Sequence, residues 1–254
     1  MMNNNLKDKS CRFVFVVPVY NASKTLARML HSVCCQSYEN WYVFLVDDVS
    51  SPEERNAENV TVSAFRTMYP DKIDITWNED SRGKQWEMSN VLYCIKRCKD
   101  DDVICRLDAD DWLLDADTLM ALHSAYTHQH YDVVWTSHRW GYDFHGNKNI
   151  SASMPDSADP YSYPWVSSHL KTFRKSLLND VPYENFTDKD GKLFTITADQ
   201  ALYLPVLKKA TKRGHMPIVA YHYSIDDTDG LVYTTNYAKL QRETGEFIRK
   251  RNYV

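Results

Sequence analysis

The sequence predicts one α/β domain whose mostly parallel β-sheet is flanked by helices. Between residues 12 and 136, short β-branched and aromatic segments alternate with segments whose apolar residues recur at helical spacing. This alternation is typical of parallel sheets. Polar residues directly follow three of the expected strands, at the edge where sheets of this kind bind ligands. The 254 residues suit one large domain or two small ones, and no internal repeat is present.

Each element of the chain is expected from its own residues. The expected strands cover residues 12–19, 41–46, 73–77, 103–107 and 132–136. The first helix follows a candidate N-cap at Ser23, and the second begins at Ser51 with a proline in its first turn. Two more helices are expected around residues 88–95 and 119–126. The second half is expected to contain loops over 141–164, a strand over 218–223 and a helix over 239–251.

Composition is that of an ordinary soluble globular protein. Hydrophobic residues make up 43% and charged residues 25% of the chain, and the net charge is −4, so no overall attraction to nucleic acid is expected. The longest apolar run, residues 13–19, is too short to span a membrane. Residues 1–11 are expected to form a flexible N-terminus, because they are polar and lack the apolar segment of a signal peptide.

Six cysteines, all before residue 106, lie mostly within apolar runs. Such residues are typically buried free thiols of a reducing compartment. Cys94 and Cys98 have helical spacing, but no second Cys or His pair completes a zinc site. We therefore expect six free thiols and a cytoplasmic protein.

Three carboxylates, Asp108, Asp110 and Asp111, come directly after the strand expected at 103–107. Alternate side chains of an extended segment share a face, so Asp108 and Asp110 are expected to lie side by side. Two adjacent carboxylates repel unless a cation lies between them, and oxygen ligands suit a hard divalent ion. The alternative is that these acids only decorate a solvated turn. An EF-hand fits poorly, because leucines stand where it requires a glycine and a final glutamate.

Nucleotide sites built on glycine-rich loops are disfavoured. The chain has seven glycines, and it contains neither G-x-G-x-x-G nor a phosphate loop. A haloacid-type phosphatase would carry its aspartates after the first strand, where this chain has none. These exclusions favour a diphosphate that is held through a metal by carboxylates.

Three segments resemble the signatures of one enzyme family. Residues 16–21 (VVPVYN), 45–51 (LVDDVSS) and 107–112 (LDADDW) resemble, in order, the opening, the V-D-D-G-S signature and the metal-binding D-x-D of glycosyltransferase family 2. Residues 168–174 and 198–202 look like acceptor-side segments of a family branch. The resemblance implies a single domain with the Rossmann-related GT-A fold. We expect a donor-binding half at 12–136, an acceptor-binding half at 137–235 and a C-terminal helix at 236–254.

The resemblance also implies roles for individual residues. Tyr20 and Asp48 would contact the base and ribose of a nucleotide-sugar, Asp108 the ribose or the metal, and Asp110 the metal at the diphosphate. Asp199 matches the family's catalytic base, at the start of a helix where a simple N-cap is the alternative. The full set of expected nucleotide-sugar-binding residues is Pro18, Tyr20, Asp47, Asp48, Arg82, Lys84, Asp108, Ala109 and Asp110.

The chain departs from the family pattern at the third helix. The family often carries an Arg-Asn pair there, and this chain has Ser89-Asn90, so Arg82 or Lys84 would have to supply the missing charge. Val49 also stands in place of the usual glycine of the second signature. His222 is a further candidate metal ligand, because a late histidine completes the metal shell of some GT-A enzymes. A hydrogen-bonded structural histidine is the alternative.

The resemblance predicts a glycosyltransferase that uses a nucleotide diphosphate sugar, with UDP as the expected nucleotide, and Mn²⁺ or Mg²⁺. Transfer to a hydroxyl acceptor with inversion is expected. The alternatives are a non-catalytic nucleotide-sugar-binding module and a metal-dependent phosphohydrolase. A glycan or a lipid-linked saccharide is the family's usual acceptor. A modified nucleic-acid base is the alternative, which would require one basic face formed by the residues Lys171, Arg174, Lys175, Lys208, Lys209, Lys212 and Arg213.

Overall fold

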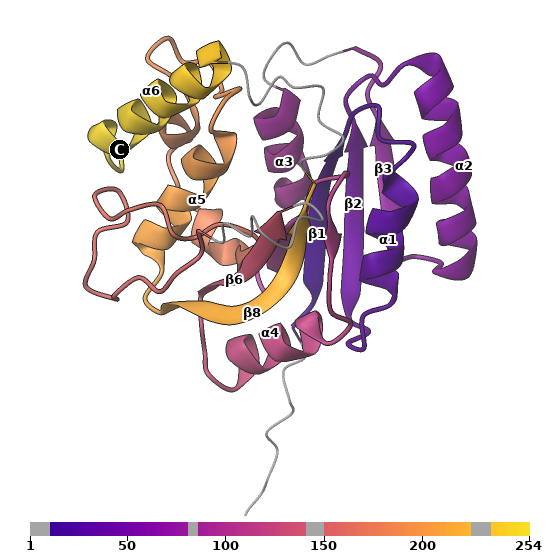
Figure 1. The fold of residues 1–254 in the computed structure, drawn as a ribbon, viewed down its shortest axis with the longest axis horizontal. Coiled ribbons are helices and arrows are strands. Elements are labelled where there is room, and N and C mark those ends of the chain that lie inside the picture. Colours follow the sequence, from indigo (N-terminus) through magenta and orange to yellow (C-terminus); the bar gives the residue numbers. More distant parts are fainter. Residues whose placement is uncertain (1–10, 81–85, 141–149, 225–234) are drawn as a thin grey trace, which may run out of the picture.

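The computed structural model describes residues 11–80, 86–140, 150–224 and 235–254, which form one α/β domain (Figure 1). The strands are β1 Phe13–Val19, β2 Trp41–Asp47, β3 Ile73–Trp77, β4 Val103–Arg106, β5 Trp112–Leu113, β6 Val133–Trp140, β7 Lys171–Arg174 and β8 Arg213–Tyr223. The helices are α1 Leu26–Cys34, α2 Pro52–Met68, α3 Trp86–Lys96, α4 Thr118–Thr127, α5 Ala198–Lys209 and α6 Thr235–Arg251. Two short 3₁₀ helices cover Lys175–Leu178 and Tyr183–Phe186.

All eight strands belong to one sheet, in the order β3-β2-β1-β4-β7-β6-β8-β5. The first four are parallel to one another. β7 runs antiparallel to both of its neighbours, whereas β6 and β8 are parallel. The predicted α/β class and mostly parallel sheet are confirmed. The sequence did not predict β5 and β7, and β7 is the strand that joins β4 to the second half of the chain.

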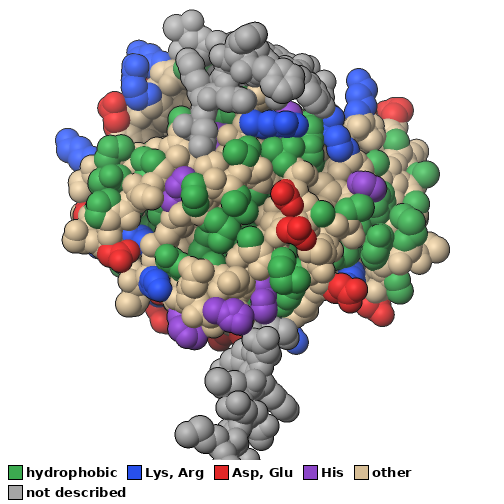
Figure 2. Space-filling model, turned by 60° about the horizontal axis from the view of Figure 1, so that its bottom comes forward, with side chains coloured by type: hydrophobic (Ala, Val, Ile, Leu, Met, Phe, Trp, Pro, Cys, Tyr) green, Lys and Arg blue, Asp and Glu red, His purple; other side chains and the backbone are tan. Residues whose placement is uncertain are grey.

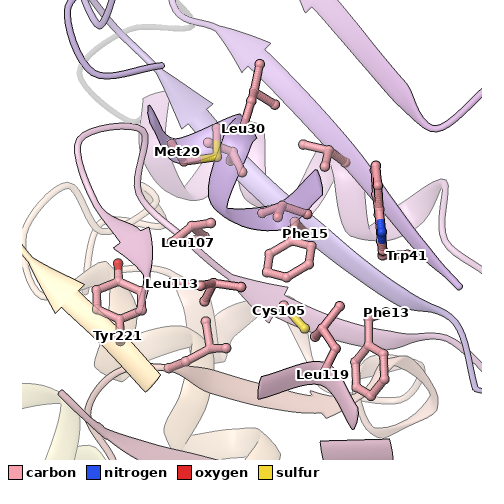
Figure 3. Packing of buried hydrophobic residues seen from close by; sticks show 14 of the residues in the cluster. Phe13, Phe15, Met29, Leu30, Trp41, Cys105, Leu107, Leu113, Leu119 and Tyr221 are labelled. Carbon is pink, nitrogen blue, oxygen red and sulfur yellow. The ribbon is translucent and has the colours of Figure 1, made fainter. Parts of the chain in front are cut away.

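The apolar run of β1 is buried on both faces of the sheet. Phe13 and Phe15 belong to one hydrophobic cluster, and Val14 and Val16, which alternate with them, belong to a second. Side chains of a strand point to opposite faces in turn, so a continuous apolar run requires cover on both sides. In the first cluster, Met29 of α1 and other helix residues contact the sheet (Figure 3). The second cluster is completed by residues of α3 and α5.

Two helix starts explain how the loops after β1 and β2 are shaped. Ser51 is the N-cap of α2, as predicted, and its hydroxyl accepts a hydrogen bond from the amide of Glu54 at 3.3 Å. The prediction of Ser23 as the cap of α1 is wrong, because the cap is Thr25. The amide of Ser23 instead donates to the carboxylate of Glu54 at 3.0 Å, which ties the two loops together.

The structure describes the C-terminal end of the chain but not residues 1–10. Residues 1–10 of the expected flexible N-terminus lie outside the described residues, and Cys11 is buried. The expected C-terminal helix is present as α6, which lies beside α5 (Figure 1). Residues 150–164 contain neither helix nor strand, as expected, and 141–149 lie outside the described residues. None of the helices in the described ranges is both long and apolar enough to cross a membrane.

Candidate active site

A cavity of about 760 Å³ lies where the end of β4 meets the starts of α3 and α5. Its charged lining includes Glu87, Arg106, Asp108, Lys171 and Asp199. Residues of α6 and the end of β6 complete the wall. Helix N-termini carry partial positive charge, so the two carboxylates in the first turns of α3 and α5, Glu87 and Asp199, are placed where negative charge is favoured.

The aspartates after β4 divide into two kinds. Asp108 and Asp110 are half-exposed, and Asp108 accepts a hydrogen bond from the guanidinium of Arg106 at 3.0 Å. Asp111 is buried and accepts hydrogen bonds from the hydroxyl of Tyr221 and, at 2.7 Å, from the amide of Ser224. Burial, followed by the charges of Asp110 and Asp108, raises the pKa of Asp111 well above its ordinary value. Ala109, between the two half-exposed carboxylates, is also buried.

These carboxylates fit a hard divalent ion only as part of a larger set of ligands. Asp108 and Asp110 offer oxygen atoms at the surface of the protein, the kind of ligand that Mn²⁺ and Mg²⁺ prefer. Among residues 11–80, 86–140, 150–224 and 235–254, however, no three His, Cys, Asp or Glu side chains are grouped so that they could hold a metal. The donor set therefore suits an ion that is also held by ligand phosphates and water.

His222 is placed differently from these two aspartates. Its ring is buried and stacks on Trp112 with 3.6 Å between ring centroids, and its Nδ1 accepts a hydrogen bond from Nε of Arg139 at 3.0 Å. The guanidinium of Arg28 covers the Trp112 ring, 3.6 Å from its centroid. Burial and the charges of Arg139 and Arg28 lower the pKa of His222 to about 4. These contacts are those of a histidine that joins β5 to β8.

The loops after β1 and β2 carry the other expected nucleotide contacts. Tyr20 is exposed and Pro18 half-exposed. Asp48 is buried, and its carboxylate accepts a hydrogen bond from the side-chain Nδ2 of Asn78 at 3.5 Å. Asp47 is fully buried and accepts hydrogen bonds from the amides of residues 49 and 50, both at 3.2 Å, and from Nε of Arg55 at 3.1 Å. Asp47 thus stabilises the loop after β2 through hydrogen bonds inside it, whereas the side chain of Tyr20 is accessible to solvent.

Val49 stands in the loop after β2 in place of the usual glycine. Val49 has φ 65°, in the left-handed region that glycine adopts readily and β-branched residues rarely do. A conformation of this kind costs on the order of 1–3 kcal/mol. The hydrogen bond from the Val49 amide to the carboxylate of Asp47 helps to hold it.

Arg106 is a buried cation that the sequence analysis missed. Its guanidinium donates to the carbonyl of Val16 at 3.0 Å, to Glu87 at 3.1 Å and to Asp108 at 3.0 Å. Arg106 of β4 therefore connects β1, α3 and the segment after β4 at the cavity wall. Arg82 and Lys84, the residues expected to supply the family's missing arginine charge, lie outside the described residues. The sequence signal that could have indicated this role is the presence of an arginine at the end of an otherwise apolar strand.

Asp199 occupies the first turn of α5 but does not cap it. The N-cap is Thr197, with φ 60°, and no side-chain cap hydrogen bond is formed there. The carboxylate of Asp199 lies at the cavity, with Oδ2 3.6 Å from Nζ of Lys171. Lys171 is the second cation of the wall that the sequence analysis did not assign to the site.

Aromatic and imidazole rings form part of the cavity wall. Trp140 donates from Nε1 to Nε2 of His138 at 2.5 Å, and His169 stacks on Tyr221 with 4.6 Å between centroids. Burial, with a smaller contribution from Lys171, lowers the pKa of His138 to about 4 and that of His169 well below its ordinary value. Both histidines are therefore neutral at physiological pH. Two further rings at the cavity are those of Trp165 and Tyr223.

The basic residues of the second half differ in exposure and in their partners. Lys171 and Arg213 are buried, and Lys175 and Lys208 pair with Asp100 and Asp159, at 2.6 and 2.8 Å. Lys171 and Arg213 therefore cannot contribute to a basic face on the surface. On the side of the molecule shown in Figure 2, Lys and Arg side chains are scattered among polar and hydrophobic ones.

A protein-family model, Glycosyl transferase family 2, matches residues 14–192. The chain belongs to glycosyl transferase family 2. It is 26% identical over 121 residues to EpsE of Bacillus subtilis (strain 168), which covers 48% of this chain and 41% of EpsE. It is 30% identical over 103 residues to the amylovoran biosynthesis glycosyltransferase AmsB of Erwinia amylovora, covering 41% of this chain and 32% of AmsB. The chain thus spans less than half the length of these relatives.

Solved structures of GT-A glycosyltransferases share the fold. S. aureus TarS 1-349 superposes with a TM-score of 0.61 at 18% identity, covering 84% of this chain and 60% of that one. The mannosyltransferase PcManGT of Pyrobaculum calidifontis, solved with GDP-Man and Mn²⁺, superposes with a TM-score of 0.60 at 15% identity, covering 94% of this chain and 62% of that one. The predicted GT-A fold is confirmed.

Proposed function

We propose that the chain is a glycosyltransferase that moves a sugar from a nucleotide diphosphate donor to a hydroxyl group of an acceptor. One observation carries the proposal. Asp108 of the D-x-D segment and Asp199 of α5 line the same cavity, although 91 residues separate them in the sequence. Sugar transfer needs stabilisation of the leaving diphosphate and a base for the acceptor hydroxyl, and it needs both in one place.

On this proposal, the nucleotide lies against the loops that follow β1 and β2. The exposed ring of Tyr20 contacts the base, and the carboxylate of Asp48 accepts hydrogen bonds from the base or ribose. Pro18 supports this loop from the end of β1, and Asp47 holds the neighbouring loop through its internal hydrogen bonds. TarS has been solved with UDP and PcManGT with GDP-Man, which supports a nucleotide-sugar donor. We infer a UDP-sugar for this chain.

The half-exposed carboxylates of Asp108 and Asp110 would hold Mn²⁺ or Mg²⁺ next to the donor diphosphate. Ala109 lies between them in the sequence and would be close to the donor as well. When bound, the ion supplies positive charge that stabilises the leaving diphosphate. Arg106 contributes by fixing Asp108 through its 3.0 Å hydrogen bond. His222 takes no part in this proposal, since its ring and Nδ1 contact Trp112 and Arg139.

Asp199 is proposed as the catalytic base. Its carboxylate would accept the proton of the acceptor hydroxyl while the hydroxyl oxygen forms a bond to the anomeric carbon and the bond to the diphosphate breaks. This single displacement inverts the anomeric centre and needs no protein nucleophile. The placement of Asp199 in the first turn of α5, facing the cavity that Asp108 also lines, supports this assignment.

The acceptor is proposed to be a glycan. Flat rings such as those of Trp140, Trp165 and Tyr223 pack well against the apolar faces of sugars. The neutral imidazole of His169, which lines the cavity, can hydrogen-bond to hydroxyl groups without carrying charge. The alternative acceptor, a nucleic-acid base, is less well supported, because Lys175 and Lys208 already pair with Asp100 and Asp159.

The proposal is tested by ligand binding followed by turnover. Purified protein is screened by thermal shift with UDP-glucose, UDP-galactose, UDP-N-acetylglucosamine and GDP-mannose, each with and without Mn²⁺, because a ligand that binds the folded state raises the melting temperature. Donors that bind are then assayed for release of the nucleoside diphosphate. We expect a metal-dependent shift and slow release in water, accelerated by saccharide acceptors.

Variants separate the proposed enzyme from a binding module. Asp199→Asn should keep donor binding and lower turnover by roughly 10²-fold or more. Asp190→Asn serves as the matched control, because Asp190 is an exposed carboxylate outside the cavity lining. Donor binding without any turnover by the wild-type chain would favour the non-catalytic module instead.

A further inference from the structure

Lys171 is a buried lysine at the start of β7, with its side chain only 5% exposed. Its ammonium group lies 3.6 Å from Oδ2 of Asp199. Within the described ranges, no other carboxylate forms an ion pair with it. Removing an ammonium from water is costly unless a partner compensates, so the fold places Lys171 and Asp199 as a pair.

The described cavity lining contains four cations: Arg106 and Lys171, which are buried, and Arg242 and Arg249, which come from α6. Arg106 donates to Glu87 and Asp108, at 3.1 and 3.0 Å, so its guanidinium is committed to the donor side of the cavity. The nearby imidazoles are neutral, because burial and the charge of Lys171 lower the pKa values of His138 and His169. Lys171 is thus the cation that Asp199 pairs with in the described structure.

The geometry of the pair leaves one carboxylate oxygen available. Oδ2 of Asp199 faces the ammonium, whereas Oδ1 forms no hydrogen bond with the described residues. β7 is held on both sides by antiparallel pairing to β4 and β6, so the base of the Lys171 side chain is fixed by the sheet. The ion pair with this side chain favours the orientation of the carboxylate in which Oδ2 faces the ammonium.

We propose that Lys171 is a positioning residue that holds Asp199 through Oδ2 and presents Oδ1 to the acceptor hydroxyl. This inference rests on the proposed function of the same cavity. The acceptor proton moves to Oδ1, the acceptor oxygen bonds to the anomeric carbon, and the electrons of the breaking bond pass to the diphosphate oxygen. Lys171 takes no part in the proton transfer and contacts neither substrate.

Two other roles for Lys171 make different predictions. If the ammonium contacted the donor diphosphate, its removal would weaken nucleotide binding. If it only filled space beneath the cavity, its removal would change stability without a specific effect on turnover. A positioning role lowers kcat through Asp199 and leaves both nucleotide affinity and the donor KM in place.

The test compares Lys171→Met, Asp199→Asn and the double variant with the wild-type chain. Lys171→Met keeps the length and apolar stem of the side chain and removes its charge. Calorimetry with UDP and Mn²⁺ measures nucleotide affinity, and nucleoside diphosphate release from the donor that the panel identifies measures turnover. We expect Lys171→Met to lower kcat by roughly 10–100-fold with nucleotide affinity within about twofold of wild type. The double variant should be no slower than Asp199→Asn, because Lys171 acts through Asp199.

Each outcome decides the inference. Turnover of Lys171→Met within about twofold of wild type would overturn it, as would loss of UDP affinity or a double variant whose losses multiply. If Lys171→Met does not fold, Lys171→Gln, which keeps a polar end in the same strand, is measured in its place against the same criteria. A wild-type chain that binds UDP but releases nothing from any donor contradicts the proposed function, and the inference falls with it. If the wild-type chain turns over and Lys171→Met turns over equally fast, the inference is contradicted and the proposed function is not.

Discussion

The hydroxyl group of Tyr221 donates a hydrogen bond of 2.5 Å to the buried carboxylate of Asp111. The amide of Ser224 donates to the other oxygen at 2.7 Å, and the hydroxyl of Ser224 donates to the carbonyl of Asp110 at 2.7 Å. Tyr221 of β8 and Ser224, which follows β8, therefore hold the segment after β4 in place. Of the three aspartates in this segment, Asp111 is structural, which leaves Asp108 and Asp110 at the surface.

Replacing Tyr221 by phenylalanine should destabilise the fold. The ring stays in the core, but Asp111 loses a donor and remains buried. A hydrogen bond to a buried acidic group of this kind is worth about 1–3 kcal/mol. Urea denaturation should show this loss. Tyr183→Phe, at an exposed tyrosine, should leave the free energy of unfolding unchanged. Equal stability of Tyr221→Phe and wild type would contradict the structural role of Asp111.

Asp110→Asn should abolish most of the metal-dependent nucleotide affinity without loss of stability. The carboxylate of Asp110 is half-exposed, and an amide is a much weaker ligand for a hard cation. Calorimetry with UDP and Mn²⁺ should show at least a roughly tenfold weaker affinity, while the melting temperature of the free protein is unchanged. Asp101→Asn is the control, because Asp101 is exposed before the other end of β4. Wild-type affinity in Asp110→Asn would remove this residue from the proposed metal site.

The first half of the fold could be predicted because its signals are local. The apolar run of β1 and the cap at Ser51 each depend on residues within a few positions. β7 and β5 could not be predicted in the same way. β7 has four residues with charged ends, and β5 has two residues. Their strand structure comes from pairing with β4, β6 and β8, which no short window of sequence reveals.

The candidate site could be predicted only in part, for the same reason. The D-x-D segment and Asp199 are recognisable as sequence patterns. The contacts of Arg106 with Glu87 and of Lys171 with Asp199 join residues 19 and 28 positions apart in the sequence. Sequence alone also gave no sign that Asp111, rather than Asp110, is the buried aspartate, because its partner Tyr221 is 110 residues away.

The six cysteines should all be free thiols that differ greatly in reactivity. Cys35 is exposed, whereas Cys94, Cys98 and Cys105 are buried. Burial raises the pKa of Cys94 and of Cys98 to about 12, so few of these thiols form the reactive thiolate. A colorimetric thiol reagent at pH 8 should label one thiol rapidly in the native protein and six after unfolding without reductant. The rapid phase should disappear in Cys35→Ser. Fewer than six thiols after unfolding would reveal a disulfide and contradict the expected reducing compartment.

Acidification should destabilise the fold through His138. This side chain is 2% exposed, and its neutral Nε2 accepts the hydrogen bond from Trp140. Burial lowers the pKa of His138 from 6.5 to about 4, so the unfolded chain binds the proton more readily than the folded one. The stabilising contribution is therefore complete above pH 6.5 and is lost as the pH falls toward 4. Its size is at most about 3 kcal/mol, since each pKa unit corresponds to about 1.4 kcal/mol.

The measurement is a series of urea denaturations of wild type and His138→Gln between pH 7.5 and 4. Glutamine can still accept the hydrogen bond from Trp140 but does not titrate, so any constant cost of the substitution cancels when one pH is compared with another. The free energy of unfolding of wild type should fall relative to that of His138→Gln as the pH decreases. Parallel curves for the two proteins would mean that His138 is protonated equally in the folded and unfolded states, and that the neutral imidazole assigned to the cavity wall is wrong.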